Sequence, residues 1–253
     1  RNPLLIYRND GYAGRVTKTV ALKTYSSGPR AGMDSARAYA SFYDFSSYLT
    51  LDVGGTTSDI GLIRNGEVVA QDHGEVEGIE CSLPLSDIVS IGVGGGSIFR
   101  VKEGVIRVGP DSVGSAPGPA CFGMGGKQAT ITDAFLVMGL LDPRTYFGGE
   151  MRLDVELARR AIQEVIAEPL NIEVEQATHR MLAAWAESIA DGIHRYADHN
   201  ALDLSSGVTL SAFGGGGPMA VLAVAEAAGI DTALVPRLSA VFSAHGIGFS
   251  DIA

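Results

Sequence analysis

The chain of 253 residues contains few cysteines and few basic residues, and it has no long uninterrupted hydrophobic run. Its two cysteines, Cys81 and Cys121, are too few for a disulfide framework and lack metal-ligand spacing, so we expect both to be small buried thiols. No apolar segment is long enough to span a bilayer, which argues against a membrane partner. The first residues carry no signal-peptide pattern, and the expected location is therefore cytoplasmic.

Positive charge is also scarce, with 19 Lys and Arg against 29 Asp and Glu and a net charge of -10. Nucleic-acid partners are excluded on this basis, because phosphate backbones are bound by clustered Lys and Arg. A nucleotide remains compatible with the sequence, since backbone amides can bind phosphates without basic side chains. The two standard nucleotide motifs, G-x-x-x-x-G-K-[ST] and G-x-G-x-x-G, do not match the glycine cluster at 214–217.

The most informative segment is an apolar run that contains Asp52, continues through Gly54, Gly55, Thr56 and Thr57, and leads into a second apolar run. Glycines let backbone N–H groups approach an anion, and threonines add hydroxyl donors. The pattern predicts a phosphate-binding hairpin, in which Asp52 holds Mg²⁺ through water or orients an attacking oxygen. The alternative is an ordinary tight hairpin whose glycines serve only its geometry.

A second candidate site lies near the C-terminal end, where a strand at 209–213 is followed by a glycine loop, a helix at 219–228 and a strand at 232–235. The loop consists of Gly214, Gly215, Gly216, Gly217 and Pro218. This order predicts a βαβ unit with the loop at the carboxyl edge of the sheet, where ligands bind. Its packed glycines suggest a flat ligand such as adenine and ribose, or else close packing of helix and strand.

The remaining pattern predicts a helix over about 30–43, a turn at Asn65-Gly66, and helices over 130–141, 154–166 and 172–199. A third glycine cluster, Gly94, Gly95 and Gly96, precedes Ser97. The stretch 108–126 is rich in Gly, Ser and Pro and reads as a long ordered loop.

In this order, the blocks at 27–32, 51–59, 91–97, 108–121, 130–134 and 212–218 resemble those of the hydantoinase/oxoprolinase family. That family includes ATP-dependent 5-oxoprolinases, N-methylhydantoinases and related subunits of acetone and acetophenone carboxylases. The resemblance implies an α/β fold: a ribonuclease-H-like half of the actin, sugar-kinase and heat-shock-chaperone ATPase superfamily, with a mixed sheet and flanking helices. Two such halves close on ATP.

The resemblance also implies roles for individual residues. Asp52 and Asp59 would be the catalytic acids, with Mg²⁺ on Asp52. The nucleotide-binding residues would be Gly54, Gly55, Thr56 and Thr57 at the phosphates, and Gly214, Gly215, Gly216, Gly217 and Pro218 at the adenosine. The substrate chamber would include Gly94, Gly95, Gly96 and Ser97.

Family members carry an earlier Asp-x-Gly-Gly-Thr hairpin, whereas this chain has only one such hairpin. We therefore expect residues 1–25 to be the end of a preceding region or a linker. Residues 26–253 would form the second ATPase-like half, with a loop-rich insertion at about 84–150. The implied partners are the missing N-terminal ATPase half, a second subunit of the hydantoinase B type, and a small-molecule substrate.

The expected activity is ATP-dependent phosphorylation of a small cyclic amide, such as a hydantoin or 5-oxoproline, leading to ring-opening hydrolysis within a larger protein or complex. Two alternatives stay open. One is a subunit of an ATP-dependent ketone carboxylase, and the other is a nucleotide-binding regulatory or structural module without small-molecule chemistry.

Overall fold

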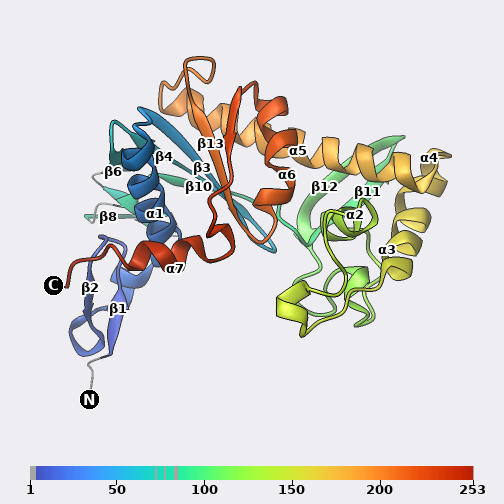
Figure 1. The fold of residues 1–253 in the computed structure, drawn as a ribbon, viewed down its shortest axis with the longest axis horizontal. Helices are drawn as coiled ribbons and strands as arrows, with labels where there is room; N and C mark the ends of the chain where they lie inside the picture. The colour runs from blue at the N-terminus through green and yellow to red at the C-terminus, as the bar shows by residue number, and fades with distance from the viewer. Residues whose placement is uncertain (1–3, 72, 77, 83–84, 253) are drawn as a thin grey trace.

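The structure of the protein is a computed structural model that describes residues 4–71, 73–76, 78–82 and 85–252. Its centre is a mixed sheet with helices on both faces, and a smaller lobe lies beside it (Figure 1). The sheet has the strand order β10-β4-β3-β13-β14. These strands are β10 (Ile88–Ile91), β4 (Ser58–Arg64), β3 (Ser47–Val53), β13 (Thr209–Gly214) and β14 (Thr232–Leu234).

Strand β4 is antiparallel to both β10 and β3, whereas β13 and β14 run parallel to β3. The short strand β5 (Glu67–Val68) pairs with β4 across the turn at Asn65 and Gly66, both of which have positive φ. Such a pair favours the two-residue hairpin turn that the sequence predicted. The predicted fold class, an α/β ribonuclease-H-like half with a mixed sheet and flanking helices, is confirmed.

Two pairs of helices cover the sheet. Helices α1 (Ser27–Tyr43) and α7 (Phe242–Ile247) pack on one face around a core that includes Met33 and Phe213. Helices α5 (Val174–His199) and α6 (Gly217–Ala228) pack on the other face around the larger core. Strand β3 is the middle strand in this order, and its buried residues belong to both cores.

The smaller lobe, drawn in green and yellow in Figure 1, contains β11 (Ser97–Lys102), β12 (Val105–Ser112), α2 (Ile131–Val137), α3 (Val155–Ile162) and α4 (Glu168–Leu170). Reciprocal hydrogen bonds between Thr130 and Asp133 form a capping box at the start of α2. The helix predicted over 130–141 ends earlier, at Val137, and the first part of the predicted loop at 108–126 belongs to β12.

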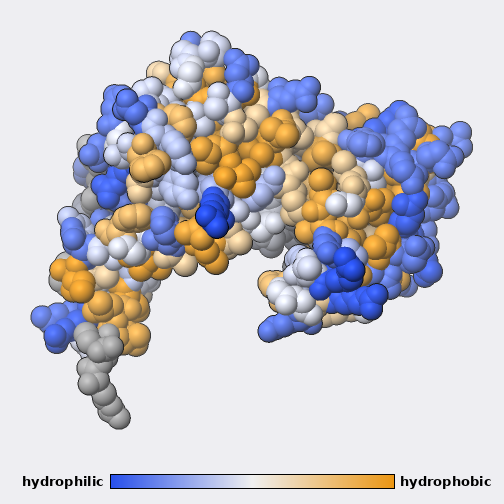
Figure 2. All heavy atoms as spheres, in the orientation of Figure 1, coloured by the Kyte–Doolittle hydropathy of each residue, from blue (hydrophilic) through white to orange (hydrophobic). Residues whose placement is uncertain are grey.

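The described structure also contains three small two-stranded antiparallel sheets: β1 (Leu5–Tyr7) with β2 (Ala13–Arg15), β6 (Ala70–Gln71) with β9 (Leu85–Ser86), and β7 (Gly74–Val76) with β8 (Ile79–Cys81). The β1–β2 hairpin contacts helix α1 and the C-terminal residues. The Tyr7 hydroxyl donates to Asp34 of α1, and Ala13 forms a bridge with Ile252. Figure 2 shows apolar side chains on the surface around this hairpin, where Leu4, Val16 and Val20 are among the exposed residues.

Within the described residues, no helix combines the length and the hydropathy needed to cross a membrane. Cys121 is a buried free thiol, as predicted, whereas the side chain of Cys81 lies outside the described part. The predicted boundaries at residue 25 and at about 84–150 stay a prediction. Strand β10, which falls inside the second of these ranges, is the edge strand of the main sheet.

Candidate active site

The tip of the β3–β4 hairpin is tight and open to solvent. Gly54 N–H donates to Thr57 O at 2.9 Å, and Gly54, Gly55 and Thr56 are exposed. A Cβ atom added at Gly55 would meet nothing within 4 Å, and φ of Gly55 is not in the left-handed region. The fold itself therefore does not require glycine at position 55.

Two carboxylates face each other just behind this tip. Asp52 and Asp59 are directly paired in the β3–β4 register, so their side chains lie on the same face of the sheet. With Pro29 and Met33 of α1, they line a small space beneath the start of that helix. Burial, together with the negative charge of Asp59, raises the pKa of Asp52 to about 6.

This donor set fits a magnesium ion that is bound together with a nucleotide. No group of three or more His, Cys, Asp or Glu side chains capable of holding a metal occurs among the described residues. Mg²⁺ does not need such a cage, because it usually keeps several waters and binds one or two carboxylates together with substrate phosphates. A cation beside Asp52 and Asp59 would also relieve the repulsion between them.

The glycine cluster at 94–96 packs directly on the hairpin. Gly95 N–H donates to Gly54 O at 2.9 Å, and Gly96 N–H donates to Gly55 O at 2.6 Å. A Cβ atom at Gly94 would lie 2.7 Å from the backbone nitrogen of Thr57, so the two backbones approach too closely for any side chain there. This geometry makes the loop a support for the hairpin, and its predicted role as a substrate chamber stays a prediction.

Further groups hold this supporting loop in place. The Trp185 indole N–H donates to Gly94 O at 3.3 Å, and the Thr132 hydroxyl donates to Gly95 O at 2.8 Å. Ser97 is buried and its hydroxyl accepts a hydrogen bond from Gly94 N–H at 2.9 Å. The sequence pattern identified Trp185 only as a core residue, because its spacing on α5 says nothing about the indole hydrogen bond.

The C-terminal glycine loop lies beside the hairpin tip, at the same end of the central strands. Gly214 has a φ of +77°, and a Cβ atom there would lie 2.3 Å from Asp52 Oδ1. Gly216 N–H donates to Val53 O at 3.2 Å, while Gly217 is buried against Ala212. Gly215 is exposed, and an added Cβ would meet nothing within 4 Å. Pro218 is half-buried in the first turn of α6.

The structure thus brings the acid pair, the hairpin tip and the C-terminal glycine loop to one edge of the sheet. One polar neighbour was not predicted: the Ser90 hydroxyl donates to Asp59 Oδ1 at 2.5 Å. Ser90 lies opposite Asp59 in the β10–β4 register. The short apolar run at Ile88 and Val89 was the available signal for strand β10, and hence for the position of Ser90.

The fold is that of one half of the ATPase superfamily, and sequence comparison identifies the family. A sequence model described as Hydantoinase/oxoprolinase matches residues 1–253, and the chain belongs to that family. It is 33% identical over 246 residues to the caprolactamase subunit alpha of Pseudomonas jessenii, covering 96% of this chain and 35% of the relative. It is 35% identical over 251 residues to the acetophenone carboxylase gamma subunit of Aromatoleum aromaticum, covering 98% and 34%.

The chain is also 34% identical over 248 residues to 5-oxoprolinase of Saccharomyces cerevisiae, covering 93% of this chain and 19% of the relative. Two solved structures share its fold. Nucleotide-free acetone carboxylase gives a TM-score of 0.87 at 28% identity, with 98% of this chain and 35% of the other covered. The ATP-dependent caprolactamase of Pseudomonas jessenii gives 0.83 at 30% identity, with 100% and 37% covered.

The chain therefore spans about a third of the length of the first two relatives. Those relatives are named as subunits, and both solved structures belong to ATP-dependent systems.

Proposed function

We propose that this chain is the nucleotide-binding half of an ATP-dependent amidohydrolase that phosphorylates a small cyclic amide and so prepares its ring for hydrolysis. The activity belongs to the whole protein or complex, because the phosphates of ATP would lie between this half and a second one. The ring would be a hydantoin or 5-oxoproline type of amide.

One observation carries the proposal: the Asp52–Asp59 pair lies directly behind the exposed Gly54–Gly55 tip and against Gly214. In this arrangement the hairpin backbone and the hydroxyls of Thr56 and Thr57 bind phosphate oxygens. Asp52 and Asp59 hold Mg²⁺, which supplies charge neutralisation at the phosphates. The exposed Gly215 lets a flat adenosine approach the backbone of the C-terminal loop.

A second candidate is a subunit of an ATP-dependent ketone carboxylase. It is supported by the acetophenone carboxylase gamma subunit, whose identity of 35% is close to the 33% of the caprolactamase subunit. Both reactions would use the same nucleotide site, so the acceptor decides between them. A regulatory or structural module would keep nucleotide binding and lack any acceptor.

The proposed partners are an N-terminal ATPase half and a second subunit of the hydantoinase B type. Exposed apolar side chains around the β1–β2 hairpin, including Leu4, Val16 and Val20, support a protein partner on this surface. The proposed compartment is the cytoplasm.

The test combines binding and turnover in the full-length protein with its partner subunit. Isothermal titration with Mg-ATP compares the wild type with Asp52→Asn and Gly55→Ala, and Asp191→Asn on the exposed face of α5 serves as the control. We expect both site variants to bind at least about tenfold more weakly and to remain folded, since one phosphate or metal contact contributes roughly 1.5–3 kcal/mol. The control variant should bind like the wild type.

Phosphate release then identifies the acceptor. Stimulation by a cyclic amide supports the amidohydrolase, and stimulation by a ketone with bicarbonate supports the carboxylase. Release that no acceptor stimulates would support the regulatory module. Wild-type Mg-ATP affinity in both Asp52→Asn and Gly55→Ala would refute the proposed nucleotide site.

A further inference from the structure

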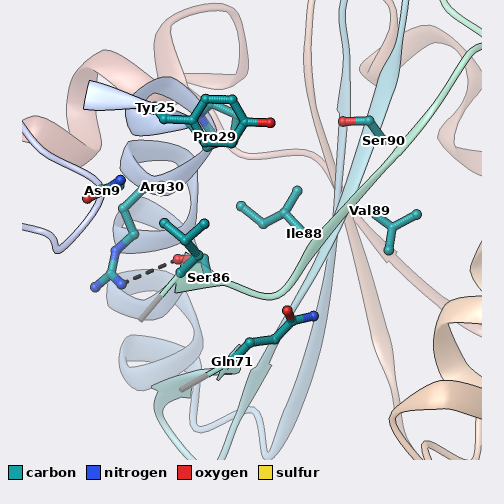
Figure 3. A pocket seen from close by; sticks show the side chains of 11 residues that line it. Asn9, Tyr25, Pro29, Arg30, Gln71, Ser86, Ile88, Val89 and Ser90 are labelled. Carbon is teal, nitrogen blue, oxygen red and sulfur yellow. Dashed lines mark hydrogen bonds between the residues drawn. The ribbon is translucent and has the colours of Figure 1, made fainter. Parts of the chain in front are cut away.

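A cavity of about 460 Å³ opens beside the acid pair, on the α1 face of the edge strand β10. Tyr25, Pro29, Arg30, Ser86, Ile88 and Ser90 are among the residues that line it, and Figure 3 shows them converging from α1, β10 and the segments around them. Its volume falls in the range of about 300–1,000 Å³ that is usual for small-molecule sites.

The position of the cavity matches a place in the proposed reaction. From one side of the sheet to the other, the strands run β14, β13, β3, β4 and β10. The C-terminal glycine loop follows β13, the phosphate hairpin joins β3 to β4, and the cavity adjoins β10. A nucleotide with its adenosine on the glycine loop and its phosphates on the hairpin would therefore direct its terminal phosphate toward the cavity.

The end of the cavity nearest the acids is polar. Figure 3 shows the hydroxyl groups of Tyr25 and Ser90 pointing toward one another across the cavity. Ser90 also donates to Asp59, so this end is connected by a hydrogen bond to the acid pair. Ile88 and Pro29 supply apolar walls that suit the ring carbons of a small heterocycle.

Arg30 stands at another side of the cavity, where its Nη1 donates to the Ser86 hydroxyl at 3.3 Å. Among the described lining residues it is the one that carries a charge. Its Nε and Nη2 groups donate to Asp34 at 3.1 and 3.2 Å, which fixes the orientation of the guanidinium. Asp34 also pairs with Arg37, so a single carboxylate faces two guanidinium groups and one positive charge is left over.

We propose that this cavity is the acceptor subsite and that Arg30 selects acceptors with a negatively charged substituent, such as a lactam bearing a carboxylate. The inference rests on the proposed function in treating the bound lactam as the acceptor. Binding of an anionic lactam to the cavity is independent of that function. Tyr25 and Ser90 hold the amide end near the acid pair, and Arg30 is a specificity-determining residue that contacts the opposite substituent.

The test compares two five-membered lactams, 5-oxoproline and 2-pyrrolidinone, which differ by the carboxylate alone. Isothermal titration of the full-length protein measures the binding of each, and ATP-dependent phosphate release measures KM and kcat. The variants are Arg30→Gln, Arg30→Lys and Ser86→Ala. Arg195→Gln is the matched control, because Arg195 is exposed on α5 and is not among the residues that line the cavity.

We expect Arg30→Gln to weaken 5-oxoproline binding and raise its KM by at least about tenfold, because a charge-assisted hydrogen bond is lost. Binding of 2-pyrrolidinone should change by less than about twofold, because this lactam has no carboxylate and Arg30 does not contact its amide group. Arg30→Lys should restore part of the affinity, and Arg195→Gln should leave the binding of both lactams unchanged. Ser86→Ala keeps the ion pair with Asp34 and should weaken only 5-oxoproline, by a smaller factor.

Equal effects of Arg30→Gln on both lactams, or wild-type affinity for 5-oxoproline in both Arg30→Gln and Ser86→Ala, would overturn the inference. Failure of the wild type to bind 5-oxoproline would also overturn it. If the wild type binds 5-oxoproline in an Arg30-dependent way but no cyclic amide stimulates phosphate release, the inference about the cavity stands and the proposed amidohydrolase function fails.

Discussion

Neutralising Asp52 should make the protein more stable while removing function. Burial and the adjacent Asp59 raise the pKa of Asp52 from its ordinary value of 3.8 to about 6. A rise of this size corresponds to about 3 kcal/mol that the folded chain loses when this carboxylate is ionised. The amide introduced by Asp52→Asn would still be a buried polar group, so we expect this substitution to recover about 1–2 kcal/mol of the loss.

The raised pKa of Asp52 also determines how the stability of the protein changes with pH. Between about pH 4 and pH 6, the folded chain keeps the proton on Asp52 while the unfolded chain has released it. The folded state therefore binds more protons, and its stability falls as the pH rises through this window and stays low above it. The amide in the Asp52→Asn variant does not ionise, so the advantage of the variant should be near zero at about pH 4 and full at about pH 8.

Calorimetry of the nucleotide-free protein at both pH values measures this difference. At pH 8 the transition of Asp52→Asn should lie about 2–8 °C above that of the wild type, given roughly 2–4 °C per kcal/mol for a unit of this size. The exposed Asp191→Asn control should show no such pH-dependent gain. A variant that melts below the wild type at pH 8, or a difference that does not change with pH, would refute the raised pKa that we infer for Asp52 from its burial and from the adjacent Asp59.

Two further substitutions test how the site is supported, each by thermal or denaturant unfolding. Gly214→Ala should destabilise the protein by more than about 2 kcal/mol, because φ of Gly214 is +77° and the new Cβ would lie 2.3 Å from Asp52 Oδ1. Gly215→Ala is the control and should change the stability by less than about 0.5 kcal/mol. Equal effects of the two substitutions would contradict this prediction. Asp133→Asn should lower the free energy of unfolding by about 2 kcal/mol. The buried carboxylate accepts hydrogen bonds from the N–H groups of Cys121 and Thr130, and one of these donors would then face an amide NH₂ group. An unchanged unfolding midpoint would contradict this prediction.

The sequence predicted those elements that begin or end at a recognisable turn or capping residue. The hairpin turn at Asn65 and Gly66, the cap of α3 at Asp154 and the βαβ unit that leads to β14 all follow from residues close in sequence. Strand β10 has no such signal, because four residues at a sheet edge become a strand through pairing with β4. The prediction therefore missed Ser90, and with it the cavity next to Asp59.

For the acid pair, the sequence predicts the position of the two side chains but not the pKa of Asp52. Once the hairpin register is predicted, Asp52 and Asp59 must face each other, because they are equally distant from its tip. The raised pKa of Asp52 could not be predicted in this way. It depends mainly on burial, and Pro29 and Met33 of α1 are among the residues beside the carboxylate.

Glycine clusters signalled the site in the sequence, yet the structure divides them into two kinds. At Gly94, Gly214 and Gly216 a Cβ atom would come within 2.8 Å of Thr57, Asp52 or Val53, so the packing of the chain alone requires glycine there. At Gly55 and Gly215 neither the surroundings nor φ requires it. Packing thus accounts for the first kind and leaves the second without an internal reason.

The two open glycines, Gly55 and Gly215, lie on the hairpin tip and on the neighbouring loop, where a bound nucleotide would need free access to the backbone. The glycines that packing does not explain are therefore stronger evidence for a ligand than the clusters as a whole.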